Sequence, residues 1–365
     1  MRVGLFLGHP AHFHMLKNTA KALNENGHDV CFVIKKKDIL EDLLADAGYT
    51  YTMIREERGN DLIGLMRSVL GMEKSMCSFL YKNKIDILVG STLSFASRVI
   101  MHTPTIVMGE DDWNIVPRFA KMVFPFASSI LSPFVCNIGK WSYKKIGYAG
   151  YQKLSYLHPN YFVPDKKIVE QYFPVDESPY YIIRFAKLTA HHDVGVKGFT
   201  QEVAKKVIDK LKVHGRVYIT SEAPLPKELE QYRLCINPLD IHHILAFASL
   251  YIGDSQSMAV EACMLGTPCV RFNDFVGKKK ISVLEELESV YHLTNGIHSK
   301  DVEKLYQKVD EILAMDNAKD VYQERRMKML QDKIDVTKFW TWFLENYPNS
   351  SVQHDENNEF WQQFK

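Results

Sequence analysis

Residues 250–273 read LYIGDSQSMAVEACMLGTPCVRFN, and this stretch decides the fold of the chain. It opens with an apolar run of the kind that fills a buried parallel strand. Gly253 permits a sharp turn, and Asp254 or Ser255 can cap a helix because a short side-chain oxygen accepts a bond from an orphaned backbone N–H. The following residues have helical character up to Gly266, which ends the helix. The stretch therefore predicts a strand, a turn, a helix and a second strand.

The predicted turn has the features of a phosphate-binding site. A helix start presents unpaired N–H groups and the positive end of a dipole, and small residues let an anion approach them. Asp254, Ser255, Gln256, Ser257 and Met258 occupy this position. The alternative is an ordinary strand–helix–strand unit that binds nothing, because such units serve proteins of many functions.

Glu261 lies one helical turn beyond Ser257, on roughly the same face of the predicted helix. A carboxylate there cannot contact the phosphate itself. It can accept hydrogen bonds from the two hydroxyls of a ribose attached to that phosphate. In the alternative interpretation Glu261 is a solvated surface residue.

The composition excludes several classes of protein. The chain has 365 residues, enough for two domains of ordinary size, and a net charge of +1, which argues against a nucleic-acid-binding protein. The six cysteines are scattered and form no C-x-x-C pair, which is typical of a reduced, cytoplasmic protein. The sequence shows neither a signal peptide nor an apolar stretch of membrane-spanning length.

Strand patterns alternate with helix patterns along most of the chain, which predicts α/β domains with doubly wound parallel sheets. The expected strands lie at residues 3–7, 30–34, 49–54, 85–89, 104–108, 128–131, 180–185, 217–220 and 250–252. Ligands of such sheets bind beyond the carboxyl ends of the strands. The turn from Gly8 to His14, Ser91-Thr92 and the acidic run from Glu110 to Asp112 all follow expected strands.

The stretch DSQSMAVEACMLGTPCV resembles the donor-binding signature of GT-B enzymes that use sugar nucleotides. Non-hydrolysing UDP-N-acetylglucosamine 2-epimerases have the same Asp-Ser start, a Glu-Ala pair at the same offset and a Leu-Gly-x-Pro end. The departure is Gln256-Ser257, where the epimerases have two glycines. The segments YLHPNYFVPD (156–165), RFAKLTAHHDVG (184–195) and KIDVTKF (333–339) extend the resemblance to an uncharacterised GT-B family, a domain of unknown function found in archaea and bacteria.

The resemblance implies two Rossmann-like domains with a cleft between them. Residues 1–155 form the first, acceptor-side domain and residues 179–332 the nucleotide-sugar-binding domain. A stretch rich in tyrosine and proline, 156–178, is the expected linker. The aromatic helix within 333–347 is expected to pack back on the first domain. The polar segment 348–365 is the tail, and we expect its polar run to be disordered.

The resemblance also assigns roles to residues of the first domain. Inverting GT-B transferases often place a catalytic base in the loop opened here by Gly8, and imidazole suits that role because its pKa lies near working pH. His12 is the first candidate and His14 the second; otherwise they are structural turn residues. In the epimerases a catalytic Glu follows the corresponding strand, and Glu110 or Asp111 would match it here. Clustered carboxylates raise one another's pKa, which suits acid–base catalysis.

In the second domain, Arg184 and His191 lie at the place where the epimerases contact the nucleotide. A guanidinium can bind phosphate oxygens in a fork, and a salt bridge to a carboxylate is the alternative for Arg184. With Gly8 and residues 254–258 and 261, these residues form the expected nucleotide-sugar site. No metal or other cofactor is expected, because no metal-ligand spacing occurs near the histidines and GT-B sites usually work without metal.

These features imply a glycosyltransferase that uses a nucleotide sugar, UDP-linked, to modify a saccharide or lipid-linked acceptor in cell-surface polysaccharide or glycolipid synthesis. A non-hydrolysing UDP-N-acetylhexosamine 2-epimerase is the first alternative, since its donor half is alike. A catalytically inactive nucleotide-sugar-binding protein is the second. The expected location is the cytoplasm, with the inner face of the membrane as the alternative. A homodimer is a further expectation.

Overall fold

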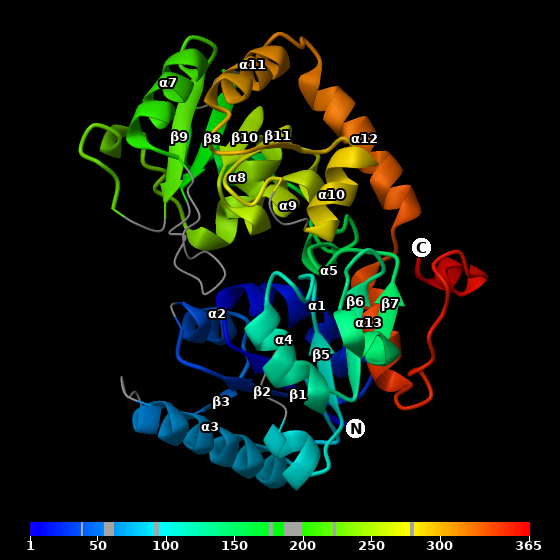
Figure 1. The fold of residues 1–365 in the computed structure, drawn as a ribbon. Coiled ribbons are helices and arrows are strands. Elements are labelled where there is room, and N and C mark those ends of the chain that lie inside the picture. The colour runs from blue at the N-terminus through cyan, green and yellow to red at the C-terminus, as the bar shows by residue number, and fades with distance from the viewer. Residues whose placement is uncertain are drawn as a thin grey trace. The chain divides into compact units, whose positions relative to one another are not determined.

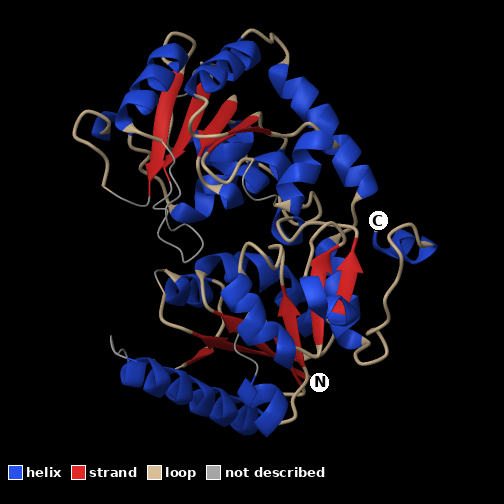
Figure 2. Cartoon of the chain, in the orientation of Figure 1, coloured by secondary structure: helices blue, strands red, loops and turns tan. Residues whose placement is uncertain are grey.

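The computed structural model describes residues 1–365 except 38, 55–61, 91–94, 175–177, 186–198, 222–223 and 278–280. The chain forms two compact units, one of residues 1–156 with 333–365 and one of residues 157–332. Each unit is a parallel sheet covered by helices (Figures 1 and 2). The predicted class, α/β with two Rossmann-like parallel sheets, is therefore confirmed.

The sheet of the first unit has seven parallel strands in the order β3-β2-β1-β4-β5-β6-β7. Its strands are β1 (Arg2–Leu7), β2 (Asp29–Ile34), β3 (Tyr51–Met53), β4 (Ile87–Val89), β5 (Thr105–Met108), β6 (Ser129–Pro133) and β7 (Lys145–Tyr148). The chain runs outward from β1 to β3 and then returns to the other side of β1 with β4. The order of the strands therefore reverses between β1 and β4.

The helices of the first unit begin where the sequence supplies capping groups. Helix α1 begins at Pro10, whose ring fixes φ, and α13 begins after Asp335, whose carboxylate accepts from the Lys338 N–H at 2.9 Å. The helices are α1 (Pro10–Glu25), α2 (Leu40–Asp46), α3 (Leu62–Asn83), η1 (Ala96–Ile100), α4 (Pro117–Val123), η2 (Phe124–Phe126), η3 (Gly139–Lys144), α5 (Leu154–Leu157), α13 (Val336–Glu345) and η6 (Glu359–Phe364).

Helix α13 completes the core of the first unit although it lies far from that unit's other elements in the sequence. It packs against α1, and its Trp340 and Phe343 are fully buried. The Ser155 carbonyl accepts hydrogen bonds from both Asn18 on α1 and Thr337 on α13, each at 2.8 Å. These contacts join the end of the chain to its beginning.

The end of η6 packs against α13, and within the preceding polar run Ser350 donates to the Phe343 carbonyl and Gln353 to those of Ser142 and Lys145, so the expectation of a disordered run is wrong. The short helix η6 buries Trp361 and Phe364 against Phe339, with ring centroids 5.2 and 5.3 Å apart. The Asp335 N–H also donates to the Phe364 carbonyl at 2.8 Å.

The sheet of the second unit has five parallel strands in the order β12-β11-β10-β8-β9. Its strands are β8 (Tyr180–Phe185), β9 (Arg216–Ser221), β10 (Leu250–Gly253), β11 (Cys269–Phe272) and β12 (Asn295–Ile297). Its helices are α6 (Lys166–Glu170), α7 (Gln201–Leu211), η4 (Glu230–Tyr232), η5 (Pro238–Asp240), α8 (Ile241–Phe247), α9 (Gln256–Leu265), α10 (Ser282–Ser289), α11 (Val302–Leu313) and α12 (Ala318–Asp332). Here the strand order reverses between β8 and β10.

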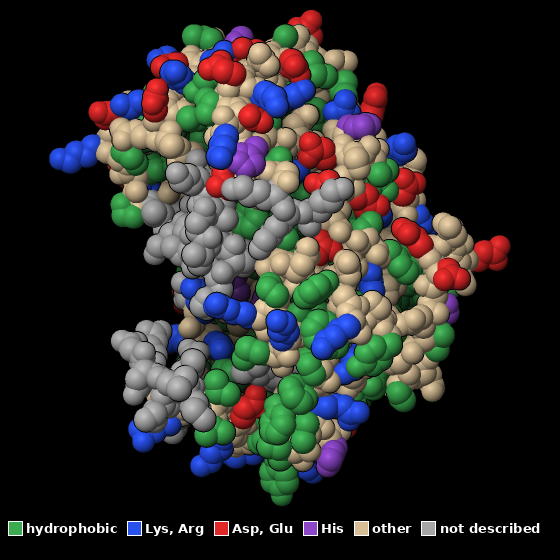
Figure 3. Space-filling model, in the orientation of Figure 1, with side chains coloured by type: hydrophobic (Ala, Val, Ile, Leu, Met, Phe, Trp, Pro, Cys, Tyr) green, Lys and Arg blue, Asp and Glu red, His purple; other side chains and the backbone are tan. Residues whose placement is uncertain are grey.

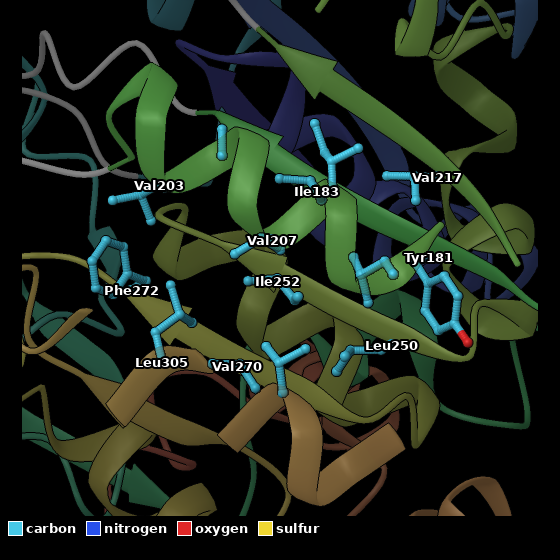
Figure 4. Packing of buried hydrophobic residues seen from close by; sticks show 14 of the residues in the cluster. Tyr181, Ile183, Val203, Val207, Val217, Leu250, Ile252, Val270, Phe272 and Leu305 are labelled. Atoms are coloured by element: carbon cyan, nitrogen blue, oxygen red, sulfur yellow. The ribbon is translucent and has the colours of Figure 1, made fainter. Parts of the chain in front are cut away.

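Apolar side chains of the strands and two helices form a core cluster of the second unit. Val203 and Val207 on α7 and Leu305 on α11 pack over the strand residues, among them Ile183 and Ile252 (Figure 4). Burial of such side chains from water is the main favourable contribution to folding. This core holds β8 and β10 side by side.

The described residues 157–174, which belong to the stretch that the sequence suggests as a linker, pack within the second unit. The Phe173 ring stacks on Tyr218 of β9, with centroids 4.3 Å apart, and the Tyr172 hydroxyl donates to Asp240 at 2.5 Å. Helix α6 contacts α8. The aromatic residues of this segment thus belong to the packing of the unit. Among the described residues, no helix has both the length and the apolar character that a membrane span requires.

Candidate functional site

Each sheet has one point where a ligand is expected on topological grounds. In an open parallel sheet the loops beyond the carboxyl ends diverge where the strand order reverses, and this leaves room for a ligand. The reversal lies between β8 and β10 in the second unit and between β1 and β4 in the first. Most of the residues predicted from the sequence lie at the ends of these strands or of β5.

The β10–α9 turn of the second unit has the predicted strand–turn–helix form. Ser255 is the N-cap of α9, and its Oγ accepts from the Met258 N–H at 3.4 Å. The first N–H groups of a helix have no intrahelical partner, so those of Gln256 and Ser257 are the groups that a ligand at the helix start would contact. At the other end Gly266 has φ +68°, the left-handed conformation that ends a helix.

Gly253 is required at the end of β10 for steric reasons. A Cβ at this position would collide with the Tyr251 hydroxyl and lie 2.9 Å from the Arg184 Cβ. Gly253 is also in register with Arg184 on β8. The glycine therefore lets β8 and the end of β10 approach each other closely.

Asn273, which sequence analysis did not single out, holds the β10–α9 turn from the end of β11. Its side chain is fully buried, and Nδ2 donates to the Asp254 carbonyl at 3.2 Å. Its Oδ1 accepts from Gln256 Nε2 and from the Phe275 N–H, each at 3.1 Å. These bonds fix the turn at the helix start, and they engage the Gln256 side chain. The only sequence signal is that a polar residue directly follows a buried strand.

Glu261 lies one turn into α9 and contacts a buried histidine. Its Oε1 is 3.3 Å from Nε2 of His242 on α8, and both side chains are largely shielded from solvent. The Phe162 ring packs edge-on against His242, with centroids 6.1 Å apart. Glu261 is therefore held in place by its neighbours and is not the solvated residue of the alternative interpretation.

Several candidate residues surround the Tyr251 phenol. Burial is the main cause that raises the pKa of Tyr251, and the charges of Asp254, Glu261 and Arg184 act on the same hydroxyl. Arg184 also donates to Thr220 Oγ1 on β9 at 2.9 Å. The Asp254 N–H donates to the Arg184 carbonyl at 3.3 Å, so these two predicted residues lie together at the β8–β10 reversal, whereas His191 lies outside the described residues.

A pocket of about 490 Å³ opens at the ends of β11 and β12. Its lining consists of Val276, Gly277, Gly296, Ile297, His298, Asp301 and Lys304. Strand β11 separates β12 from β10, so this pocket is displaced from the helix start. None of the predicted binding residues lines it.

In the first unit, the histidines of the β1–α1 turn make local hydrogen bonds. His9 is the N-cap of α1, and its Nδ1 accepts from the Ala11 N–H at 3.2 Å. The Nδ1 of His12 accepts from the Gly8 N–H, also at 3.2 Å. A neutral imidazole that accepts at Nδ1 carries its proton on Nε2. His12 in this arrangement offers a ligand an N–H group and not a lone pair.

His12 is neutral at physiological pH. Burial first, and then the electrostatic effects of His9 and Lys153, lower the pKa of His12 from 6.5 to about 4. Since the protonated form would lose both hydration and its bond from Gly8, the neutral form is strongly favoured. A base of such low pKa accepts a proton weakly, and this weakens the case for His12 as the catalytic base.

The acidic run after β5 is largely engaged in the structure of the first unit. Glu110 Oε1 accepts from the Gln152 N–H at 2.6 Å, and Oε2 lies 3.4 Å from Lys153 Nζ. The buried Asp112 accepts from the Asn137 N–H at 2.6 Å. Asp111 is exposed. Two of the three carboxylates therefore hold loops together.

His14 lies in the second turn of α1 and is half-buried. Its ring is 5.9 Å from that of Tyr156 on α5 and 6.0 Å from that of Phe13. Ser91 and Thr92, expected at the end of β4, lie outside the described residues. Within the described part of the chain, no three His, Cys, Asp or Glu side chains are grouped so that they could hold a metal ion.

No protein-family model and no curated protein matches the sequence. Solved structures do match over nearly the whole chain. A UDP-N-acetylglucosamine 2-epimerase from Neisseria meningitidis, bound to UDP-GlcNAc, is 14% identical with a TM-score of 0.67, over 94% of this chain and 100% of that one. A structure described as a putative 2-epimerase of the same kind from Listeria monocytogenes is 14% identical with a TM-score of 0.69, over 97% and 98%.

Glycosyltransferases are among the similar structures as well. The spinosyn rhamnosyltransferase SpnG, in complex with spinosyn aglycone, is 13% identical with a TM-score of 0.62, over 95% of this chain and 100% of that one. At these identities the likeness concerns the fold. The chain has the GT-B fold, as its donor-site motif led us to expect.

Proposed function

We propose that this chain is a nucleotide-sugar enzyme, specifically a metal-independent glycosyltransferase that uses a UDP-linked donor. The observation that carries the proposal is the β10–α9 unit. It combines a capped helix start with a carboxylate one turn deeper, held by His242. The similar structures include an epimerase bound to UDP-GlcNAc and a rhamnosyltransferase bound to its aglycone. The acceptor would be a saccharide or a lipid-linked saccharide.

The donor would be held by the second unit. Its diphosphate would accept from the N–H groups at the start of α9, and the ribose hydroxyls would donate to Glu261. Gln256 replaces a glycine of the related signature, but its side chain is bonded to Asn273. Its bulk is thereby directed toward β11, which is compatible with an anion at the helix start. Arg184 and His191 are the further candidates for contacts to the nucleotide.

The carboxylates of Glu110 and Asp112 are occupied by hydrogen bonds within the first unit, and this favours glycosyl transfer over epimerisation. A transferase needs one base, whereas a 2-epimerase needs several acid–base groups around the sugar. Glu110, one of the two carboxylates that the resemblance suggests, accepts from the Gln152 N–H and from Lys153. We assign the base to His14, the second histidine candidate, because burial lowers the pKa of His12 to about 4 and its Nδ1 accepts from the Gly8 N–H. His12 would donate its Nε2–H to the substrate.

The donor site predicts a loss of UDP affinity in Glu261→Ala. Removal of charge-assisted hydrogen bonds to the ribose should cost about 1.5–3 kcal/mol, or roughly 10- to 150-fold in Kd. Titration calorimetry with UDP measures the change directly. Glu261→Gln, which keeps an acceptor for His242, separates the ribose contact from a loss of local structure. Glu324→Ala, an exposed carboxylate on α12, is the matched control. Unchanged UDP affinity in Glu261→Ala would remove this assignment.

The two enzyme classes differ in the fate of the proton at C2 of the sugar. A 2-epimerase exchanges that proton, whereas a transferase has no reason to break the bond. Incubation with UDP-N-acetylglucosamine in heavy water, followed by mass spectrometry, should therefore show no deuterium in the sugar. Only slow release of UDP is expected until an acceptor is supplied from cell extract. Deuterium at C2 that disappears in Glu110→Gln would instead establish epimerisation. Tight UDP binding with no turnover of any nucleotide sugar would indicate a binding protein.

A further inference from the structure

Exposed apolar side chains gather on η1 and α4 of the first unit. Phe95, Val99 and Ile100, in and just before η1, are 44%, 45% and 55% exposed, and Met122 on α4 is 50% exposed. Phe95 packs edge-on against Phe126 of η2, with ring centroids 5.4 Å apart, which joins the two elements. Figure 3 shows apolar side chains gathered in the lower part of this view, with several basic groups and one acidic group beside them. We call this surface the η1–α4 face.

Three exposed basic side chains lie on η1 and α4, and one partly buried carboxylate, Glu73 of α3, contacts η1. Arg98 on η1 and Arg118 and Lys121 on α4 are all exposed. The sequence contains no Asp or Glu in residues 87–109 or 113–164, although the whole chain has a net charge of only +1. Burial, and then the charge of Arg98, lowers the pKa of Lys144, so further positive charge lies near. Positive charge is therefore concentrated here and is not a property of the whole molecule.

The exposure of Val99 and Ile100 follows from how η1 is held. Glu73 on α3 accepts from the Ala96 N–H at 2.7 Å. On its inner side, the buried Ser97 hydroxyl is 2.8 Å from that of Thr105 on β5. The small and polar residues of η1 thus face the rest of the first unit. The large apolar and basic residues of η1 are therefore directed to solvent.

We propose that the η1–α4 face docks on the surface of an anionic lipid bilayer. Apolar side chains on a short amphipathic element insert among lipid headgroups, and flanking cations are attracted to anionic lipids. A second copy of this chain is a poorer occupant, because a symmetric contact would bring Arg98, Arg118 and Lys121 against the same charges. The proposal is independent of the proposed reaction.

Flotation of the full-length protein with phosphatidylcholine vesicles, with and without phosphatidylglycerol, tests the proposal. Wild-type protein should float only with the anionic vesicles and should be released by salt, which screens the attraction. Arg98→Glu combined with Lys121→Glu should weaken binding by at least roughly 30-fold, since each cation near the surface contributes about fivefold. Ile100→Glu should abolish it.

Matched controls on the second unit keep the test specific. Val213 is an exposed valine and Lys328 an exposed lysine, so Val213→Glu and Lys328→Glu should leave flotation unchanged. Unfolding of each variant in urea shows whether it is folded. The proposal would be overturned if the wild type floated with neither kind of vesicle, or if the variants of the η1–α4 face floated as well as the wild type. A wild-type dimer that Ile100→Glu dissociates would overturn it too. The last would assign the face to a second copy.

Discussion

Turnover should fall by about a hundredfold in His14→Gln and by less than tenfold in His12→Gln. General base catalysis contributes about 10²- to 10⁴-fold, and glutamine cannot supply it. At position 12 glutamine reproduces what the histidine does in the structure. Its Oε1 can accept from the Gly8 N–H, as Nδ1 does at 3.2 Å, and its Nε2 can donate as the imidazole does.

The assay is the release of UDP from the donor, first without acceptor and then with cell extract. Both variants should bind UDP like the wild type, because neither residue belongs to the second unit. A hundredfold loss in His12→Gln with normal turnover in His14→Gln would return the base role to His12. Full activity in both variants would transfer it to Asp111, the exposed carboxylate after β5.

The free energy of unfolding of the first unit should fall by on the order of 3 kcal/mol between about pH 6.5 and pH 4 on account of His12. The pKa of His12 is lowered to about 4 in the folded state and is about 6.5 in an unfolded chain. Below pH 6.5 the unfolded state binds a proton that the folded state does not, so acid favours unfolding. Above pH 6.5 both forms are neutral, and the effect of His12 is absent.

Tryptophan fluorescence during urea unfolding isolates this effect. All five tryptophans lie in the first unit, at positions 113, 141, 340, 342 and 361, so the signal reports that unit alone. The difference between wild type and His12→Gln, measured at several pH values, removes the contributions of other groups. An equal pH dependence in the two proteins would mean that His12 titrates normally.

The β10–α9 unit could be predicted from the sequence because its signals are local. The capping hydroxyl of Ser255 and the left-handed Gly266 act within a few residues of their own position, and both have the predicted roles. The alternation of strands and helices likewise revealed the two parallel sheets. Strand β7 was missed because Lys145–Tyr148 lies between a glycine-containing 3-10 turn and a tyrosine-rich stretch, with only one branched apolar residue.

The partners of the candidate catalytic and binding groups could not be predicted from local signals in the sequence. Glu110 contacts Lys153 more than forty positions along the chain, and Glu261 contacts His242 on another helix. Such pairs depend on how elements pack and leave no periodic signal. The same holds for Phe173 and Trp361, whose segments look like a linker and a polar tail until their rings are placed against partners.

The return of α13 to the first unit has a consequence for synthesis of the protein on the ribosome. The first unit lacks Phe339, Trp340 and Phe343 until residues 157–332 have been made, because its chain is interrupted by the whole second unit. The surface of α1 that α13 covers is open during that interval. The second unit, which is contiguous, can complete its folding first. The nascent first unit is therefore the part of the chain that chaperones would have to protect. Termination of synthesis before residue 333 leaves this unit without a helix of its core.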